Sequence, residues 1–178
     1  MKYSMGLLAL AVGAANAAGV HVHGQSQLQV ALDNDTAAVV WTTPANDLVG
    51  FEHAPKTDAQ ASQVQAALTR ASEPLLDFSG ACILTASSIE NPFAEHGHED
   101  EHNHDDEHGH DEHQASSEDA HTDFRIEQQY RCSTPPTEFA FTGFDRFYDV
   151  EKVRVEWVSA NGAGQINLTA DAPSTEIE

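Results

Sequence analysis

Positive charge is scarce in this chain of 178 residues, which contains 8 Lys and Arg against 29 Asp and Glu. Binding to nucleic-acid phosphates needs a basic surface, so the composition excludes nucleic acid as an expected partner. The formal net charge of −21 instead favours cations, and metal ions are the natural counterpart of so acidic a chain. The length suits a single domain, since about 100–200 residues form a typical one.

Long apolar runs are also lacking. The first apolar stretch, Met5 to Ala15, is shorter than the roughly 20 residues of a membrane span, and no later segment comes close. With Lys2 before it and the small residues of Ala15-Asn16-Ala17 after it, this stretch predicts a cleavable export signal over residues 1–17. We therefore expect residues 18–178 to form a single domain in the periplasm or outside the cell, not embedded in the membrane.

Only two cysteines occur, Cys82 and Cys132, and neither has another metal-ligand residue at short spacing. An even number of cysteines in an exported chain favours a disulfide. A shared metal ion is the alternative. The two residues also open and close a predicted hairpin, so the sequence predicts a disulfide between Cys82 and Cys132.

Residues 82–89 and 123–132 are predicted to be the two antiparallel strands of that hairpin. With the cysteines opposite each other, Leu84 faces Tyr130, Ala86 faces Gln128 and Ser88 faces Ile126. This register leaves one face largely apolar and collects on the other Arg125, Glu127, Gln129 and Arg131; a slip of one residue would destroy the sorting. The connection over residues 95–121 contains no Val, Ile, Leu, Phe or Tyr, so we expect a disordered loop insertion.

The remaining patterns indicate an α+β fold. Residues 27–32 and 37–42 alternate as a hairpin, with Leu28, Val30 and Leu32 on the inner face. Thr57 and Gln60 form a capping box before a helix whose predicted buried stripe is Ala61, Val64, Ala67, Leu68 and Ala71. A short helical turn is expected around Phe144 to Tyr148, followed by a last hairpin. The residues of this hairpin expected to point inward are Val153, Val155, Trp157, Ile166 and Leu168. The expected fold is an antiparallel sheet built of hairpins, with one main helix and one long His/Asp/Glu-rich hairpin loop.

Residues 95–121 hold eight His, eleven Asp or Glu and no Lys or Arg. From residue 96 a six-residue repeat supplies two imidazoles one residue apart, followed by carboxylates. The histidines of the segment are His96, His98, His102, His104, His108, His110, His113 and His121. Zinc takes four ligands from imidazole nitrogen, thiolate sulfur or carboxylate oxygen, whereas an acidic linker explains Asp and Glu but not periodic His. We expect several moderate-affinity zinc sites, with nickel and copper as alternative metals.

A second group of histidines lies near the mature N-terminus. A single residue, Val22, separates His21 from His23, so in a strand both point to the same face and suit one shared ion. Such a pair at a terminus is more often incidental, and His53, in the loop from Gly50 to Pro55, is an equally weak candidate alone. Spacing does not place His53 beside the pair.

The combination of these motifs resembles a known bacterial family. The motifs are His21-Val22-His23-Gly24 after an export signal, the stretch Leu48-Val49-Gly50-Phe51-Glu52-His53-Ala54-Pro55, the acidic poly-His segment, His121-Thr122-Asp123-Phe124 and Tyr130-Arg131-Cys132. They are similar to those of the zinc-regulated, His-rich periplasmic proteins of the ZrgA type, which are associated with zinc uptake. The likeness covers essentially the whole mature chain, and the two elements with His23 and His53 are its most specific part.

The resemblance implies a periplasmic zinc binder that works beside an uptake transporter. It also implies an ordered zinc site with His21, His23 and His53 as ligands, completed by His121 or by water. A zinc buffer or detoxification sponge without a transporter partner is the alternative function. A hydrolase would need a general base at an open metal position, for which Glu52 is a candidate, but no nucleophile motif and no His-Glu-x-x-His occurs. We therefore expect no enzymatic activity.

Overall fold

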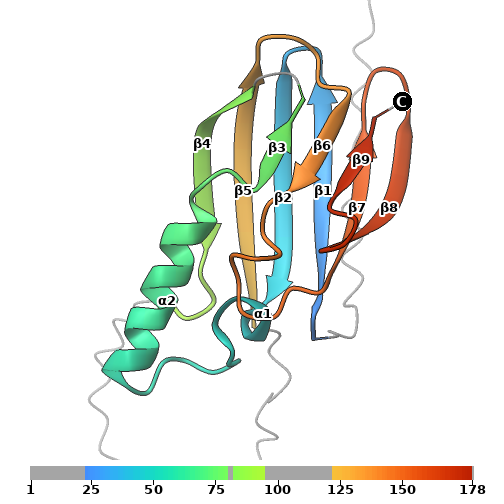
Figure 1. Ribbon diagram of the computed structural model, residues 1–178. Coiled ribbons are helices and arrows are strands. Elements are labelled where there is room, and N and C mark those ends of the chain that lie inside the picture. The colour runs from blue at the N-terminus through green and yellow to red at the C-terminus, as the bar shows by residue number, and fades with distance from the viewer. Residues whose placement is uncertain (1–22, 80–81, 95–121, 178) are drawn as a thin grey trace, which may run out of the picture.

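The computed structural model describes residues 23–79, 82–94 and 122–177 (Figure 1). The predicted export signal, His21 and the His-rich segment 95–121 lie outside the described residues, so those predictions stay untested by the fold. The helices and strands are β1 (Gln25–Asp33), β2 (Thr36–Pro44), α1 (Ala45–Val49), α2 (Asp58–Ala71), β3 (Leu76–Phe78), β4 (Cys82–Glu90), β5 (Asp123–Cys132), β6 (Glu138–Phe141), β7 (Lys152–Val158), β8 (Ala163–Thr169) and β9 (Ser174–Glu176). None of the helices in these ranges is long and apolar enough to cross a membrane.

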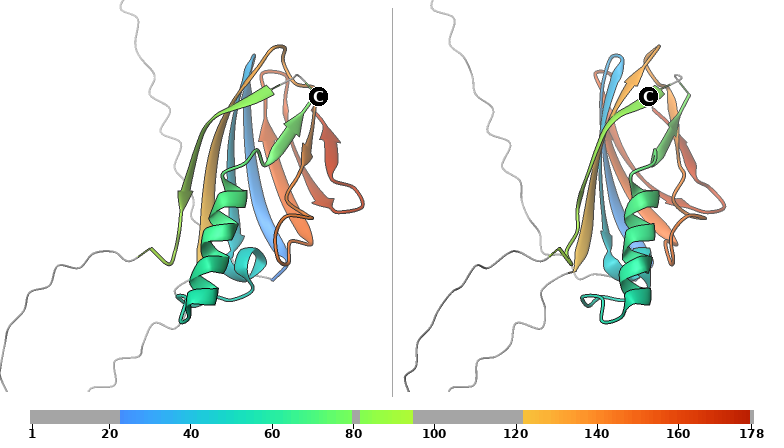
Figure 2. Two further views of the ribbon diagram at one scale, coloured as in Figure 1. Left: turned by 60° about the vertical axis from the view of Figure 1, so that its left-hand side comes forward. Right: turned by 90° about the vertical axis from the view of Figure 1, so that its left-hand side faces the viewer.

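Within the described residues, the strands form a large sheet in the order β4-β5-β2-β1-β7-β8 and a small sheet in the order β3-β6-β9. Helix α2 and the small sheet lie on the same face of the large sheet (Figure 2). The core fills the space between them, and its largest side chains with essentially no exposure include Trp41, Phe124, Phe139, Leu28 and Leu75. The α+β class predicted from the sequence is confirmed.

The strand alternation predicted for the first and last hairpins of the chain is also confirmed. Leu28 and Val30 of β1 and Val153 and Val155 of β7 are buried on the covered face. The prediction that Ile166 points into the core is wrong. Ile166 pairs with Val155, but it lies in β8, the edge strand of the large sheet, and is 37% exposed.

β1 and β7 pair in parallel, with Leu28 opposite Val155, whereas the neighbouring pairs in the large sheet are antiparallel. The sequence predicted hairpins only, because alternation shows which face a residue takes and not which strand lies beside it. The parallel pair starts where the backbone N–H groups of Glu151 and Lys152 donate to the carbonyl oxygen of Gly24. It therefore brings the segment before β7 next to the segment before β1.

The β4–β5 hairpin begins in the predicted register, with Cys82 opposite Cys132 and Leu84 opposite Tyr130. A bulge then shifts the pairing, so Ala86 faces Gln129 and not Gln128, and Ser88 faces Glu127 and not Ile126. Thr85 lies at the bulge, and its hydroxyl donates to the carbonyl oxygen of Gln129 at 3.0 Å. The predicted sorting of β5 survives, because the buried residues alternate along this strand and include Phe124, Ile126, Gln128 and Tyr130.

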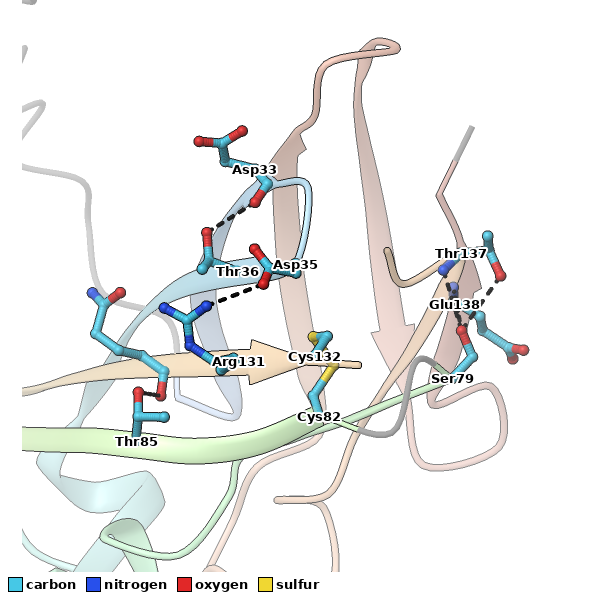
Figure 3. Close-up of a disulfide and its surroundings, with 11 residues drawn as sticks. Asp33, Asp35, Thr36, Ser79, Cys82, Thr85, Arg131, Cys132, Thr137 and Glu138 are labelled. Atoms are coloured by element: carbon cyan, nitrogen blue, oxygen red, sulfur yellow. Dashed lines mark hydrogen bonds and ion pairs between the residues drawn. A yellow bond between two sulfur atoms is a disulfide. The ribbon is translucent and has the colours of Figure 1, made fainter. Parts of the chain in front are cut away.

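The predicted disulfide between Cys82 and Cys132 is confirmed (Figure 3). It joins the start of β4 to the end of β5, beside the turn between β1 and β2. There the backbone N–H of Cys132 donates to the carbonyl oxygen of Asp35 at 2.7 Å, and Arg131 pairs with the Asp35 carboxylate at 3.0 Å. The cysteines are therefore bonded to each other and lie at the opposite end of the hairpin from residues 94 and 122.

Helix α2 begins as predicted. The Thr57 hydroxyl accepts the N–H of Gln60 at 3.2 Å, and the Gln60 side chain accepts the N–H of Lys56 at 2.8 Å. Val64, Ala67 and Ala71 are buried and Leu68 is half-buried, but Ala61 is exposed, which corrects the predicted stripe. The buried stripe therefore starts one turn later, at Val64.

Two parts of the fold were not predicted. Residues 45–49, expected as loop, form α1, a helix too short to show an amphipathic period. The small sheet consists of β3, β6 and β9, of which the longest has four residues. The expected helical turn near Phe144 is a hydrogen-bonded turn, in which the N–H of Arg146 donates to the carbonyl oxygen of Gly143 at 3.1 Å.

Candidate metal centre

Several segments that are distant in sequence meet at one end of the large sheet, which we call the loop end. Pro44 pairs with Asp123, Glu90 pairs with Arg125, and Gln25 pairs with Lys152. The segments that lie at the loop end are therefore those just before β1, β5 and β7, helix α1, which follows β2, and the residues after β4 (Figure 1). Residues 94 and 122, which flank the His-rich segment, both lie at this end.

Helix α1 ends at Gly50, and this glycine directs the chain into Phe51-Glu52-His53. Its φ of 78° lies in the left-handed region, and its N–H donates to the carbonyl oxygen of Asn46 at 2.7 Å. A Cβ at this position would also lie 3.2 Å from the ring of Tyr148. Only glycine takes this conformation without strain, which explains its place in the motif.

His23 lies two residues before the start of β1 and faces Glu52, with 3.7 Å between His23 Nδ1 and Glu52 Oε1. Both side chains are about half exposed or more. The next residue, Gly24, is fixed from two sides: its N–H donates to Asp47 Oδ1 at 2.9 Å, and its carbonyl oxygen accepts from the start of β7. The loop end thus holds the backbone at His23 in place and leaves the imidazole accessible.

His53 follows Glu52 in the chain. Its Nδ1 is 2.9 Å from the carbonyl oxygen of Ala54. This contact suits the tautomer that carries the proton on Nδ1, which leaves Nε2 as the metal-binding nitrogen. The side chain is exposed, so an ion from solvent reaches this nitrogen directly.

Ring contacts connect His53 to the start of the His-rich segment. The His53 ring stacks on Phe51 with 5.2 Å between centroids, Phe51 stacks on Phe93 at 5.9 Å, and Phe93 meets Phe124 edge-on at 5.6 Å. At the other end of the segment, the carbonyl oxygen of Thr122 accepts the N–H of Ala45, the first residue of α1, at 2.8 Å. The described residues that flank segment 95–121 therefore contact Phe51 on one side and the start of α1 on the other.

Asp47 of α1 is the buried acidic group of the loop end, with 0% of its side chain exposed. Burial is the largest cause that raises the pKa of its carboxyl to about 6. The N–H of Gly24 acts next to lower this pKa. Asp149 raises the pKa, His23 lowers it and Glu52 raises it. Asp47 Oδ2 is buried without a hydrogen-bond partner.

Two of the predicted ordered-site residues, His23 and His53, are among the described residues, and His23 contacts Glu52, the residue before His53. The third, His21, lies outside the described residues, as do the histidines of segment 95–121. Across residues 23–79, 82–94 and 122–177, no group of three His, Cys, Asp or Glu is already arranged to hold a metal ion. The donor types nevertheless fit zinc, which accepts imidazole nitrogen and carboxylate oxygen, and an orphaned buried carboxylate oxygen lies beside His23.

Sequence reasoning missed Asp47. Its only signal was an acidic residue directly before the apolar pair Leu48-Val49, and such a residue is usually exposed. Asp47 is held against two distant segments, because the N–H of Gly24 donates to its carboxylate and the backbone N–H of Asp149 donates to its carbonyl oxygen at 2.9 Å. No local pattern predicts a contact across a hundred residues.

The fold and the loop end define a small α+β domain with exposed imidazole groups and a buried carboxylate at one end of its sheet. A family model described as ZrgA family zinc uptake protein matches residues 20–177. The match spans most of the chain, and the chain therefore belongs to this family. No curated protein matches it.

Proposed function

We propose that this protein captures zinc in the periplasm and supports its uptake by a transporter. Family membership supports a zinc-related role. The observation that carries the proposal is the loop end itself, where His23, Glu52 and His53 lie at the same end of the large sheet as the two residues that flank the His-rich segment. Zinc is the cargo of such a protein, so sites that exchange metal suit it better than one closed structural site.

In this proposal the two groups of histidines do different work. The segment 95–121 gathers divalent ions, because its carboxylates raise their local concentration and its paired imidazoles bind them. The ordered site, with His21, His23 and His53 as the ligands that the resemblance implies, then holds one ion more tightly. Glu52 faces His23 and orients the imidazole, as carboxylates commonly do for metal-bound histidine.

The compartment is part of the proposal. Residues 1–17 have the composition of an export signal, and the Cys82–Cys132 disulfide suits an oxidising environment. A soluble zinc binder in the periplasm has access to the outer face of an inner-membrane importer, which is the kind of partner we propose.

A zinc buffer or detoxification sponge is the second candidate, and the number of His and acidic residues in segment 95–121 is the observation that favours it. We propose no enzymatic role, since the chain lacks a nucleophile motif and a His-Glu-x-x-His zinc motif.

A strain lacking the gene separates the two candidates. Uptake predicts poor growth under zinc limitation, restored by the intact gene, and normal growth in excess zinc. A strain that grows normally under limitation but fails in excess zinc would contradict the uptake proposal and support the buffer. Complementation with a His53→Ala gene is the matched control for the ordered site.

A further inference from the structure

Asp47 is the most unusual side chain of the loop end. It is fully buried, and only one of its two carboxylate oxygens is satisfied: Oδ1 accepts the N–H of Gly24, whereas Oδ2 has no hydrogen-bond partner. A buried carboxylate oxygen without a partner destabilises a fold, so its presence needs a compensating interaction.

Two acidic groups that act on Asp47, Asp149 and Glu52, make its ionised form more costly, whereas the imidazole of His23 favours that form. The side chain of Glu151 adds a further carboxylate against Gly24, 3.1 Å from where a Cβ would stand. Several carboxylates therefore converge on the turn that carries His23, and a bound divalent cation would relieve their repulsion.

We propose that Asp47 Oδ2 is a direct ligand of the tightest zinc ion, together with the imidazole of His23. The inference rests on the proposed zinc-binding function and goes beyond it, since it assigns the ordered site a carboxylate that no motif pointed to. Zinc accepts a carboxylate oxygen at about 2.0–2.2 Å beside imidazole ligands.

The two donors have different mobility. Asp47 is held by α1 and by its bond to Gly24, so its carboxylate is the fixed part of the site. His23 is exposed and adjoins Gly24, so its imidazole is free to turn about its side-chain torsions to meet an ion at that oxygen. This explains why no three-ligand group is preformed in the described residues although the donors lie at one end of the sheet.

A purely structural role for Asp47 is the competing explanation, in which the carboxylate only anchors Gly24. Two substitutions separate the explanations. Asp47→Asn keeps an oxygen that accepts the Gly24 N–H but removes the anionic donor, whereas Asp47→Ala removes both. Asp33→Asn removes one exposed carboxylate from the far end of β1 and serves as the charge control.

The experiment uses the full mature chain. Zinc affinity is measured by competition with a chromophoric chelator, and the electronic absorption of the protein with one equivalent of Co²⁺ reports the ligand set. We expect Asp47→Asn to weaken the tightest site at least tenfold, since loss of even an outer-shell partner costs about 10–100-fold. The cobalt spectrum should change, Asp47→Ala should add little, and Asp33→Asn should match wild type in both readouts.

Wild-type affinity and an unchanged cobalt spectrum in Asp47→Asn would overturn the proposal, and weakening confined to Asp47→Ala would assign Asp47 to anchoring alone. Circular dichroism of each variant shows whether it has folded. If the wild-type protein itself does not compete for zinc, the proposed function falls with the inference. If it competes and Asp47→Asn competes equally, zinc binding stands and only the assignment of Asp47 falls.

Discussion

At the scale of single residues, Asp47 of the loop end is unfavourable for the stability of the zinc-free fold but suited to binding a cation. Its carboxyl is buried next to other carboxylates, which is unfavourable for the zinc-free protein when the group is ionised. Functional sites commonly retain such unfavourable groups because the ligand compensates for them. The raised pKa of Asp47 turns this conflict into a measurable pH dependence.

The direction follows from proton linkage. The folded protein holds the Asp47 proton up to about pH 6, whereas the unfolded chain loses it near the ordinary value of 3.8, so stability from this group falls as pH rises between these values. A shift of this size is worth about 3 kcal/mol, which is an upper bound for the effect. We predict that the stability of zinc-free Asp47→Asn relative to wild type increases as the pH rises from about 4 to about 6 and changes little above that, measured by urea unfolding. A difference in unfolding free energy that stays constant with pH would contradict this account of Asp47.

At the scale of elements, the parts that followed from sequence are those encoded by short-range patterns. Three such parts are the alternation of β5, the Thr57–Gln60 cap of α2 and the Cys82–Cys132 pairing. In each of them, the spacing of the residues along the chain determines which side chains lie on the same face or opposite each other. The bulge near Thr85, the parallel β1–β7 pair and α1 depend on contacts between distant segments. The histidines of the candidate site were found from their motifs, but Asp47 was not, because its contacts are with Gly24 and Asp149, which are distant in sequence.

The disulfide belongs to this scale, since it closes the β4–β5 hairpin at the end opposite the His-rich segment. The cysteines are 50 residues apart, and in the chain-entropy model a closed loop of that size contributes roughly 4 kcal/mol. We predict that the double substitution Cys82→Ser and Cys132→Ser lowers the unfolding free energy by about that amount, less any strain that the bond imposes on the folded state. Urea unfolding of the variant and the oxidised wild type gives the difference.

The same variant tests the separation of the two ends. Zinc affinity of the folded double variant should equal that of wild type, because the loop end contains neither cysteine. A variant that is folded but has lost the tightest zinc site would show that the cysteines or their bond take part in binding. Thiol titration of the unfolded, unreduced wild type should find no reactive cysteine.

At the scale of the whole molecule, the fold separates a stabilising end from a binding end. The disulfide and the Arg131–Asp35 pair lie at one end of the large sheet, and the imidazoles, Asp47 and both exits of the His-rich segment lie at the other. An ion bound anywhere in segment 95–121 is therefore tethered to the loop end by the chain itself. Tethering raises the effective concentration of that ion at the ordered site.

This arrangement predicts an order of zinc release as the pH falls. Zinc binds neutral imidazole, so protons compete for it around the reference pKa of about 6.5. Weaker sites lose this competition first, and the segment should empty before the ordered site. The test is the zinc retained after equilibration between about pH 7.5 and about pH 5, for the intact protein and for a variant lacking Glu95 to Gln114. Equal release curves for the two proteins would remove the basis for a transfer from segment to ordered site.

The central claim, that one tight site at the loop end works with a multi-ion segment, is tested most directly by calorimetric zinc titration of the mature protein and of the variant lacking Glu95 to Gln114. The excised residues lie outside the described fold, and none of the contacts at the loop end given above involves them. We predict two affinity classes and more than one zinc for the intact protein, and about one tightly bound zinc for the variant. A variant that binds no zinc would contradict the ordered site, and one that keeps the full stoichiometry would contradict the role of the segment.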